Sequence, residues 1–345
     1  MNRYILRSIF SLAVSLNAPA ALAITIPTVS IGNPGNNPDT RYIDSPHPNG
    51  VGAVAQSFNI GTTEVTNSQY VALLNAVAAS DPYLLYNAGM TSDLRGGIVR
   101  SGGPGSYKYS VKPPALSGAY VYDNKPVIGV GSDDAMRFAN WLQNGQPTGV
   151  EGPGTTETGA YTLNGAFMSA DLVSVTRNSN AKWWLPSEDE WYKAAYYNPV
   201  AGLYYDYPTG TNNVPNNNPP ANDTGNSANY YDVNDTTGSD SFPLTDVGAY
   251  ALSASPYGTF DQGGSVWEFN ETLFGGSFRG LRGGSWRSQT RPPPFLRASF
   301  WNTITPSNGG NDIGFRLATT TVPEPRTLYL WASVLICCCG FRSRV

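Results

Sequence analysis

Three stretches of the chain place apolar residues three and four positions apart, which predicts three amphipathic helices. A residue that can cap a helix precedes each stretch, namely Thr66, Ser132 and Ser187. Gln69 and Glu190 follow the first and third caps by three residues, which is the spacing of a capping box. The residues expected to face the core are Tyr70, Leu73, Leu74 and Val77; Ala135, Phe138, Ala139 and Leu142; and Trp191, Ala194 and Ala195.

Glycines and tryptophans concentrate in residues 260–286. Two motifs occur there, Gly263-Gly264-Ser265-Val266-Trp267-Glu268-Phe269 and Leu281-Arg282-Gly283-Gly284-Ser285-Trp286. Paired glycines permit a positive φ and a close approach of two chain segments, and each Trp supplies apolar area that fixes the turn against a core. The stretch therefore predicts a β-hairpin in which Glu268 and Arg282 are held rather than solvated. A shorter β segment is expected at residues 125–130.

Three stretches rich in Pro, Asn, Gly and Tyr predict irregular loops at residues 24–54, 81–116 and 204–235. The first contains the only histidine, His47, which we interpret as an exposed loop residue. One histidine excludes a metal site built from several. The Asn and Asp oxygens of the third stretch suit a hard cation such as Ca²⁺, and turn capping is the alternative function of the same side chains.

Composition indicates a globular, loop-rich protein. Hydrophobic residues make up 40% of the 345 positions, with 8 Trp and 21 Tyr, which is enough to build a sizeable core. Charged residues make up only 13%, while 37 Gly and 27 Pro favour turns and long loops. All cysteines are in the run Cys337-Cys338-Cys339, so the rest of the chain has no disulfide and no thiolate metal site.

Both ends of the chain carry sorting signals. Arg3 and Arg7 precede an apolar run at residues 9–16, and Ala21-Leu22-Ala23 is a small-x-small cleavage site, so we expect residues 1–23 to be a removed signal peptide. The run is shorter than the roughly 20 residues that a membrane-spanning helix needs. Near the other end, Val322-Pro323-Glu324-Pro325 precedes the apolar residues 327–341 and two arginines, a pattern typical of a marginal membrane anchor whose positive end stays cytoplasmic.

Removal of these end segments makes the remaining domain more acidic. The whole chain has 21 basic and 25 acidic residues, and five of the basic residues but only one acidic residue lie in the two segments, so the net charge changes from −4 to −8. An acidic domain argues against nucleic acid as a partner and favours cation binding.

The two Gly-Gly-Ser motifs, followed by Ile313-Gly314-Phe315-Arg316, resemble motifs of the sulfatase-modifying-factor family, the family of the formylglycine-generating enzyme. Three further motifs match in the family's order, namely Glu64-Val65-Thr66-Asn67-Ser68-Gln69-Tyr70, Lys125-Pro126-Val127 with Asp134-Ala135 and Trp141-Leu142, and Leu185-Pro186-Ser187-Glu188-Asp189-Glu190-Trp191. The resemblance implies a single α+β domain over residues 24–320, similar to a C-type lectin fold with much irregular loop.

The C-terminal segment, residues 321–345, resembles the PEP-CTERM sorting signal of Gram-negative bacteria. This resemblance implies export and recognition of Pro323-Glu324-Pro325 by the membrane protease-transpeptidase exosortase. It further implies transient anchoring in the inner membrane by the apolar stretch, followed by delivery to the cell surface or to an exopolysaccharide-rich extracellular matrix.

The family resemblance also implies two calcium sites. One uses Asn229, in an Ala-Asn step, together with Asp240, which precedes the segment Thr245-Asp246-Val247-Gly248. The other uses Ser265 and Glu268, but Ser265 stands where the family has Asn, so one carbonyl ligand is missing. Turn capping by the same polar side chains is the alternative for both sites.

The oxidase chemistry of the formylglycine-generating enzyme depends on a cysteine pair that holds copper(I) and activates oxygen. Counting on from Arg282, Ser288 and Pro293 stand in those places, and neither residue can bind copper(I). The related iron-dependent sulfoxide synthases take their iron from histidines, most of them on an added helical domain. With one histidine and no such domain, this chain is not expected to follow that chemistry either.

What the resemblance leaves is a framework of aromatic and arginine side chains near the cleft of the fold. Arg291, Arg297, Trp301 and Asn302 are the expected ligand contacts, and Trp267, Arg282, Trp286 and Arg316 the expected structural residues. Aromatic faces with Asn and Arg donors suit sugars or peptide segments. Two functions remain, a surface-displayed module that binds carbohydrate or protein, and a protein-modifying oxidoreductase of unrecognised chemistry; the missing thiols favour binding.

Overall fold

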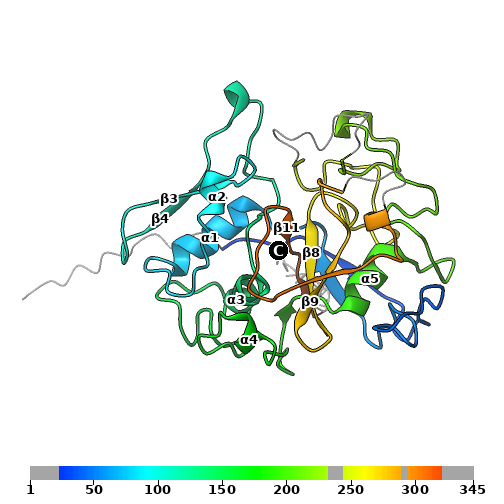
Figure 1. Cartoon of the computed structure of the whole chain (residues 1–345), viewed down its shortest axis with the longest axis horizontal. Coiled ribbons are helices and arrows are strands. Elements are labelled where there is room, and N and C mark those ends of the chain that lie inside the picture. Colours follow the sequence, from blue (N-terminus) through cyan, green and yellow to red (C-terminus); the bar gives the residue numbers. More distant parts are fainter. Residues whose placement is uncertain (1–22, 232–243, 289–293, 321–345) are drawn as a thin grey trace, which may run out of the picture.

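The computed structural model describes residues 23–231, 244–288 and 294–320. These residues form an α+β structure in which short helices and small sheets are joined by long loops (Figure 1). The predicted signal peptide, apart from Ala23, and the predicted sorting segment lie outside the described residues. Within the described part of the chain, no helix has both the length and the apolar composition needed to cross a bilayer.

The first sheet joins the beginning and the end of the described chain. Its strands lie in the order β1 (Thr28–Ile31), β2 (Phe58–Gly61), β12 (Ala318–Thr319) and β5 (Trp183–Trp184). All three pairs of neighbours are antiparallel. Because β12 lies between β2 and β5, the four-stranded sheet is complete only when β12, the last strand of the described chain, is in place.

The second sheet contains the predicted hairpin. Its order is β10 (Asn302–Ile304), β9 (Phe278–Arg282), β8 (Trp267–Phe274) and β11 (Ile313–Gly314). Strands β8 and β9 are antiparallel, with an irregularity between Phe269 and Leu273, while β11 runs parallel to β8. The hairpin prediction is confirmed, and β8 and β9 lie at the centre of the molecule (Figure 1).

The three predicted helices are present as α1 (Asn67–Val77), α3 (Ser132–Gln143) and α5 (Glu188–Tyr196). The capping boxes of α1, with Thr66 and Gln69, and of α5, with Ser187 and Glu190, are confirmed. The cap predicted for α3 is wrong by one residue. Gly131 is the N-cap of α3, because the Asp134 carboxylate accepts the hydrogen bond of the Gly131 backbone N–H at 2.8 Å, and Ser132 is the first helical residue.

Smaller elements complete the fold. They are the short helices α2 (Gly89–Ser92) and α4 (Ser169–Leu172), the hairpin of β3 (Ile98–Ser101) and β4 (Lys108–Val111), the hairpin of β6 (Tyr197–Asn198) and β7 (Leu203–Tyr204), and three 3₁₀ turns at Leu116–Gly118, Pro220–Asn222 and Pro294–Leu296. The β segment predicted at residues 125–130 is absent, because Pro126 lacks a backbone N–H and only an isolated bridge to Thr66 forms.

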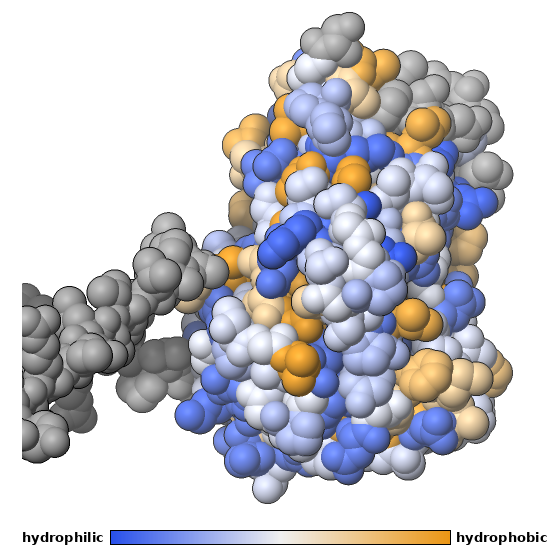
Figure 2. Space-filling view, turned by 90° about the vertical axis from the view of Figure 1, so that its left-hand side faces the viewer, coloured by the Kyte–Doolittle hydropathy of each residue, from blue (hydrophilic) through white to orange (hydrophobic). Residues whose placement is uncertain are grey.

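The main core lies between α1, α3 and the sheets. Tyr70 of α1 stacks on Phe138 of α3 with ring centroids 6.0 Å apart, and Phe315 meets Phe138 edge-on at 5.6 Å. These contacts confirm the predicted inner faces of both helices. On the face shown in Figure 2, apolar residues lie in small groups among polar residues, as is usual for a protein surface.

Three arginines are buried at the second sheet; Arg279 donates to backbone carbonyls, whereas Arg282 and Arg316 each have a carboxylate partner. Arg316 is 0% exposed and donates from Nε and Nη2 to the two oxygens of Glu268, which is also 0% exposed, at 2.6 Å each. Arg282 donates to Glu188 at 2.7 Å from Nε, with a second nitrogen at 2.5 Å. Glu268 and Arg282 face each other in the strand register, yet each finds its ion pair elsewhere.

His47 is buried, so the interpretation as an exposed loop residue is wrong. Only 7% of its side chain is exposed; Nδ1 lies 2.7 Å from Asp44 and Nε2 lies 3.3 Å from Glu188. Burial disfavours the imidazolium, but hydrogen bonding to Glu188 and then to Asp44 outweighs it and raises the pKa of His47. The loop folds inward because this ion-pair cluster, which includes Arg282 through Glu188, holds it against α5.

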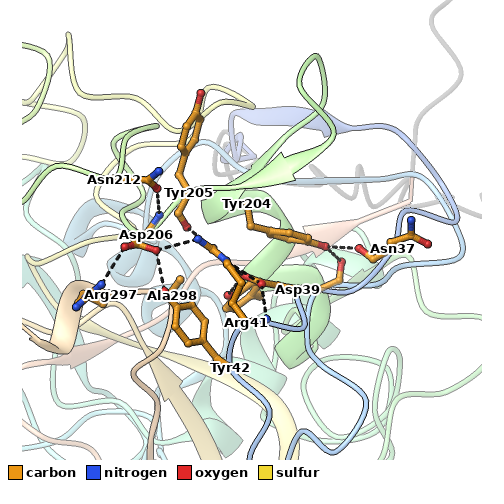
Figure 3. Close-up of polar contacts among 12 residues, drawn as sticks. Asn37, Asp39, Arg41, Tyr42, Tyr204, Tyr205, Asp206, Asn212, Arg297 and Ala298 are labelled. Atoms are coloured by element: carbon orange, nitrogen blue, oxygen red, sulfur yellow. Dashed lines mark hydrogen bonds and ion pairs between the residues drawn. The ribbon is translucent and has the colours of Figure 1, made fainter.

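A second polar network docks the N-terminal loop on the segment that follows β7 (Figure 3). Arg41 binds Asp39 at 2.8 Å and Asp206 at 3.0 Å, and the Tyr42 hydroxyl donates to Asp206 at 2.7 Å. Arg297 binds the other oxygen of Asp206 at 2.9 Å. Burial acts to raise the pKa of Asp206, but Tyr42 and Arg297 outweigh it and lower the pKa, so the carboxylate stays ionised.

Glu268→Gln is expected to lower the free energy of unfolding by up to about 3–5 kcal/mol, because it removes the charge that is hydrogen-bonded to the buried guanidinium of Arg316 and leaves that guanidinium with Glu64, which lies 3.9 Å away. Urea denaturation measures this change. In the double variant Glu268→Gln/Arg316→Met part of the loss should be recovered, whereas Asp123→Asn, at an exposed position, should change stability by no more than about 0.5 kcal/mol. A single variant as stable as the wild type would contradict the assignment.

The stabilisation by His47 should depend on pH. Because the pKa of His47 in the folded protein is raised above 6.5, its ion pairs contribute fully below pH 6.5 and are lost as the pH rises through the raised pKa. His47→Gln should therefore destabilise more at about pH 5.5 than at about pH 9, by about 1.4 kcal/mol per unit of pKa increase. An NMR titration of the single histidine gives its pKa directly, and a value below 6.5 would refute this explanation.

Candidate functional site

A pocket of about 540 Å³ opens beside the first residues of β8 and β10. One wall comes from the turn after the second Gly-Gly-Ser motif, and another from the residues just before β11. The lining residues are Trp267, Ser285, Arg287, Ser288, Phe295, Asn302 and Asp312. We call this the Ser288 pocket.

The glycines of the two motifs allow the segments that bear the pocket to lie together. The Gly264 N–H donates to the Gly283 carbonyl at 2.9 Å, and the Trp286 N–H donates to the Ser265 carbonyl at 2.9 Å. Gly264 has φ +85°, and a Cβ at this position would stand 2.2 Å from the Asn229 carbonyl oxygen. Only glycine fits this close approach, so the role predicted for the paired glycines is confirmed.

The turn from Ser285 to Ser288 is closed by its own hydrogen bonds. The Ser288 N–H donates to the Ser285 carbonyl at 2.9 Å, and the Ser285 N–H donates to Ser288 Oγ at 3.0 Å. The Ser285 hydroxyl in turn donates to Asp312 Oδ2 at 3.0 Å. The turn therefore holds Ser288, which is 5% exposed, in one orientation at the wall of the pocket.

Ser288 lacks the surroundings of a catalytic nucleophile. Within the described residues its oxygen accepts a hydrogen bond from the Ser285 N–H, and no His, Asp or Glu side chain receives its proton. A serine hydroxyl without an adjacent base is a weak nucleophile. The hydroxyl proton of Ser288 is therefore suited to hydrogen bonding with a bound group.

The rest of the pocket combines aromatic and polar walls. The Trp267 ring packs against Phe295 and Phe300, each with its centroid 6.0 Å away. Arg287 and Asn302 are exposed at the opening. An aromatic surface bordered by amide, guanidinium and hydroxyl donors can bind a planar or ring-shaped polar ligand.

The predicted ligand-contacting residues do not form one cleft. Asn302 lines the Ser288 pocket, but Trp301 stacks on Phe274 at 5.1 Å on the other side. Neighbouring residues point to opposite faces where a strand begins, which separates these two side chains. Arg297 lies at the surface in the Asp206 network of Figure 3, and Arg291 lies outside the described residues.

The four predicted structural residues are all buried. Arg282 and Arg316 form the ion pairs described above, and Trp286 packs with Ile128, Leu244 and Val266. The Arg95 guanidinium lies 4.2 Å from the centroid of the Trp286 ring. Trp267 is buried in the core and also presents part of its ring to the Ser288 pocket.

The structure describes three of the four residues predicted to bind calcium, and their surroundings differ. Asn229 is buried, and its backbone carbonyl accepts the backbone N–H of Ser265 at 2.8 Å, so Asn229 and Ser265 lie side by side. Both oxygens of Glu268 accept hydrogen bonds from Arg316, and one also accepts from Trp191 at 2.8 Å. A guanidinium thus stands where a cation would bind, so Ser265 and Glu268 do not fit a calcium ion. Asp240 lies outside the described residues.

No other metal centre is formed by the described residues, where no group of three or more His, Cys, Asp or Glu side chains could hold an ion. Among the pair of residues at the copper-binding positions, Ser288 is described and Pro293 lies outside the described residues. The structure therefore places a hydroxyl at the first of the two positions where the copper chemistry requires a thiolate.

The geometry defines an irregular α+β domain with a pocket at the joint between two Gly-Gly-Ser motifs. The model of the sulfatase-modifying factor enzyme 1-like domain matches residues 16–321, so the chain belongs to this family. The fold class predicted from the sequence is confirmed by this match.

Two curated relatives share part of the sequence. The chain is 32% identical over 153 residues to the hercynine oxygenase of Mycobacterium tuberculosis (strain ATCC 25618 / H37Rv), a match that covers 39% of this chain and 32% of that protein. It is 32% identical over 157 residues, with the same shares covered, to the hercynine oxygenase of Mycolicibacterium smegmatis (strain ATCC 700084 / mc(2)155). The chain thus spans about a third of the length of these relatives.

Solved structures also match the chain at low sequence identity. CarF has 20% identity and a TM-score of 0.49, with 86% of this chain and 99% of that chain covered. The variable protein 1 of Treponema denticola has 20% identity and a TM-score of 0.49, with 85% and 94% covered. PvdO from Pseudomonas aeruginosa has 19% identity and a TM-score of 0.43, with 85% and 92% covered.

Besides Ser285, which the sequence analysis named only as part of the second motif, three pocket residues were not predicted from the sequence, namely Arg287, Phe295 and Asp312. Two of them had a local signal, since Arg287 lies between Trp286 and Ser288, and Asp312 directly precedes the Ile313-Gly314-Phe315-Arg316 motif. Phe295 follows a run of prolines and had none.

Proposed function

We propose that this chain is an exported ligand-binding protein whose Ser288 pocket holds a carbohydrate or a peptide segment without copper chemistry. The observation that carries the proposal is Ser288 itself, a hydroxyl held at the wall of an open pocket of about 540 Å³ at the first copper-binding position. A pocket of this volume is in the range of small-molecule sites.

The chemistry of the walls supports a polar ligand with an apolar face. Trp267 and Phe295 supply aromatic surface for a sugar ring or a side chain. Ser288, Asn302 and Arg287 supply hydrogen-bond donors, and the Asp312 carboxylate supplies an acceptor. Pairing of such groups with a ligand fixes its orientation, which is how a mostly preformed pocket selects its ligand.

Binding should weaken about tenfold in Asn302→Ala, because the variant loses amide hydrogen bonds at the mouth of the pocket and the exposed position leaves folding unaffected. The first ligand is found on an array of neutral and acidic oligosaccharides and short peptides, and its affinity is then measured by calorimetry. Asn180→Ala, at an exposed position that lines neither this pocket nor the cavity described below, is the matched control. Equal affinity of both variants, or no binding on the array, would refute the proposal.

For localisation we propose export with loss of residues 1–23, followed by recognition of Pro323-Glu324-Pro325 by exosortase and release to the surface or the extracellular matrix. The support is the sequence pattern at the two ends. Intact-mass measurement of surface protein from exosortase-positive cells should give a chain that begins near Ile24 and lacks Cys337 to Cys339. Surface-exposed protein that retains these cysteines would disprove the processing.

We further propose that Ca²⁺ stabilises the domain through Asn229 and Asp240. The support is the match of these positions to the family's first calcium site and the acidic charge of the domain. A ligand at a hundredfold excess over its Kd adds about 2.7 kcal/mol to the free energy of unfolding. A chelator should therefore lower the Tm of the wild type but not of Asp240→Ala, and an unchanged Tm in both would count against calcium.

A further inference from the structure

A second cavity, of about 360 Å³, lies at the other end of β8 from the Ser288 pocket. It is formed by the N-terminal loop around His47, the first turn of α5 and the end of β8. None of the residues that line it also lines the Ser288 pocket. We call it the Asp189 cavity.

The two carboxylates of this cavity differ in how they are paired. Glu188 is fully engaged by Arg282, by Asn270 at 2.6 Å and by His47. Burial acts to raise the pKa of Glu188, but Arg282 and His47 outweigh it and hold the pKa below its ordinary value. Glu188 therefore has little capacity left for a ligand.

Asp189 is only half engaged. Its Oδ1 accepts the Gly52 N–H at 2.6 Å, while Oδ2 has no hydrogen-bond partner within the described residues. Neither lysine nor arginine lines the Asp189 cavity in the described part of the chain. Burial and then the charge of Glu188 raise the pKa of Asp189, whereas the Gly52 N–H and His47 act against this rise. Within the described residues Asp189 thus forms no ion pair with lysine, arginine or histidine, although His47 also lines the cavity.

Much of the remaining wall is apolar. Pro38, Pro46, Pro48 and Ala53 line the cavity together with Phe274, whose ring is held by stacking on Trp301. Proline and alanine surfaces pack well against a chain of methylene groups, and the face of a phenyl ring attracts a cation. A metal ion would need several oxygen or nitrogen ligands, and the described residues of the cavity do not provide such a group.

We propose that the Asp189 cavity binds a primary ammonium group at the end of an aliphatic chain, such as a lysine side chain, with Asp189 as its counter-ion. The methylene groups lie along the proline walls and Phe274, and the ammonium group reaches Asp189. The Thr272 hydroxyl and the Asn49 side chain also line the cavity and are suited to the other two N–H groups. The inference does not depend on the function proposed for the Ser288 pocket.

The test compares two probes that differ only in the ammonium group, Nα-acetyl-lysine amide and Nα-acetyl-norleucine amide. Calorimetry with the whole protein should show the lysine probe binding at least tenfold more tightly. In Asp189→Asn, which keeps an oxygen for the Gly52 N–H, this preference should disappear, while Asp123→Asn should retain it. Equal binding of both probes, or no binding of the lysine probe to wild type, would overturn the proposal.

A second variant covers the case in which Asp189→Asn does not fold. Ala53 is exposed at the rim, so Ala53→Lys should fold and place a competing ammonium group in the cavity, with at least a tenfold loss of affinity for the lysine probe. Unchanged affinity in Ala53→Lys would overturn the proposal. Asn302→Ala should leave binding of the lysine probe unchanged, and a tenfold loss there would place the probe in the Ser288 pocket instead.

Discussion

Two of the guanidinium groups buried at the second sheet, those of Arg282 and Arg316, are each paired with a buried carboxylate. Removing one member of such a pair leaves an uncompensated charge in the interior, which costs several kcal/mol. Arg316 therefore fixes the position of Glu268 on β8, and Arg282 fixes Glu188 on α5. These two pairs hold the segment around Arg316, the β8–β9 hairpin and helix α5 in one arrangement.

Both pockets follow from that arrangement. Trp267, beside Glu268, forms a wall of the Ser288 pocket, and the Arg282 pair leads through Glu188 to His47 at the Asp189 cavity. Gly264, in the first motif, lets the backbone lie close to Asn229, and the next residue, Ser265, accepts the N–H of Trp286 in the second motif. The family's scaffold is thus preserved around the position where the copper-binding thiolate would stand, although the residue there is Ser288.

The sequence predicted what depends on local interactions. Helix α1 and its Thr66 cap, the hairpin β8–β9 and the place of Ser288 all follow from spacing along the chain. The sequence-based predictions failed where contacts between distant segments decide which side chains are buried and which ion pairs form. His47 is buried because Glu188 and Asp44 bind it, and Glu268 pairs with Arg316 instead of its strand neighbour. Such choices between partners cannot be deduced from residue type.

The central claim is that the Ser288 pocket binds a ligand and does not oxidise one. The most direct measurement is to incubate the purified protein with copper, oxygen and a sulfatase-type cysteine peptide, and to determine the mass of the peptide. The account predicts no conversion to the aldehyde by wild type, and none by Ser288→Cys, because copper(I) needs two thiolates and position 293 is proline. Aldehyde formation by the wild type would contradict the account and assign the chain to the oxidoreductases.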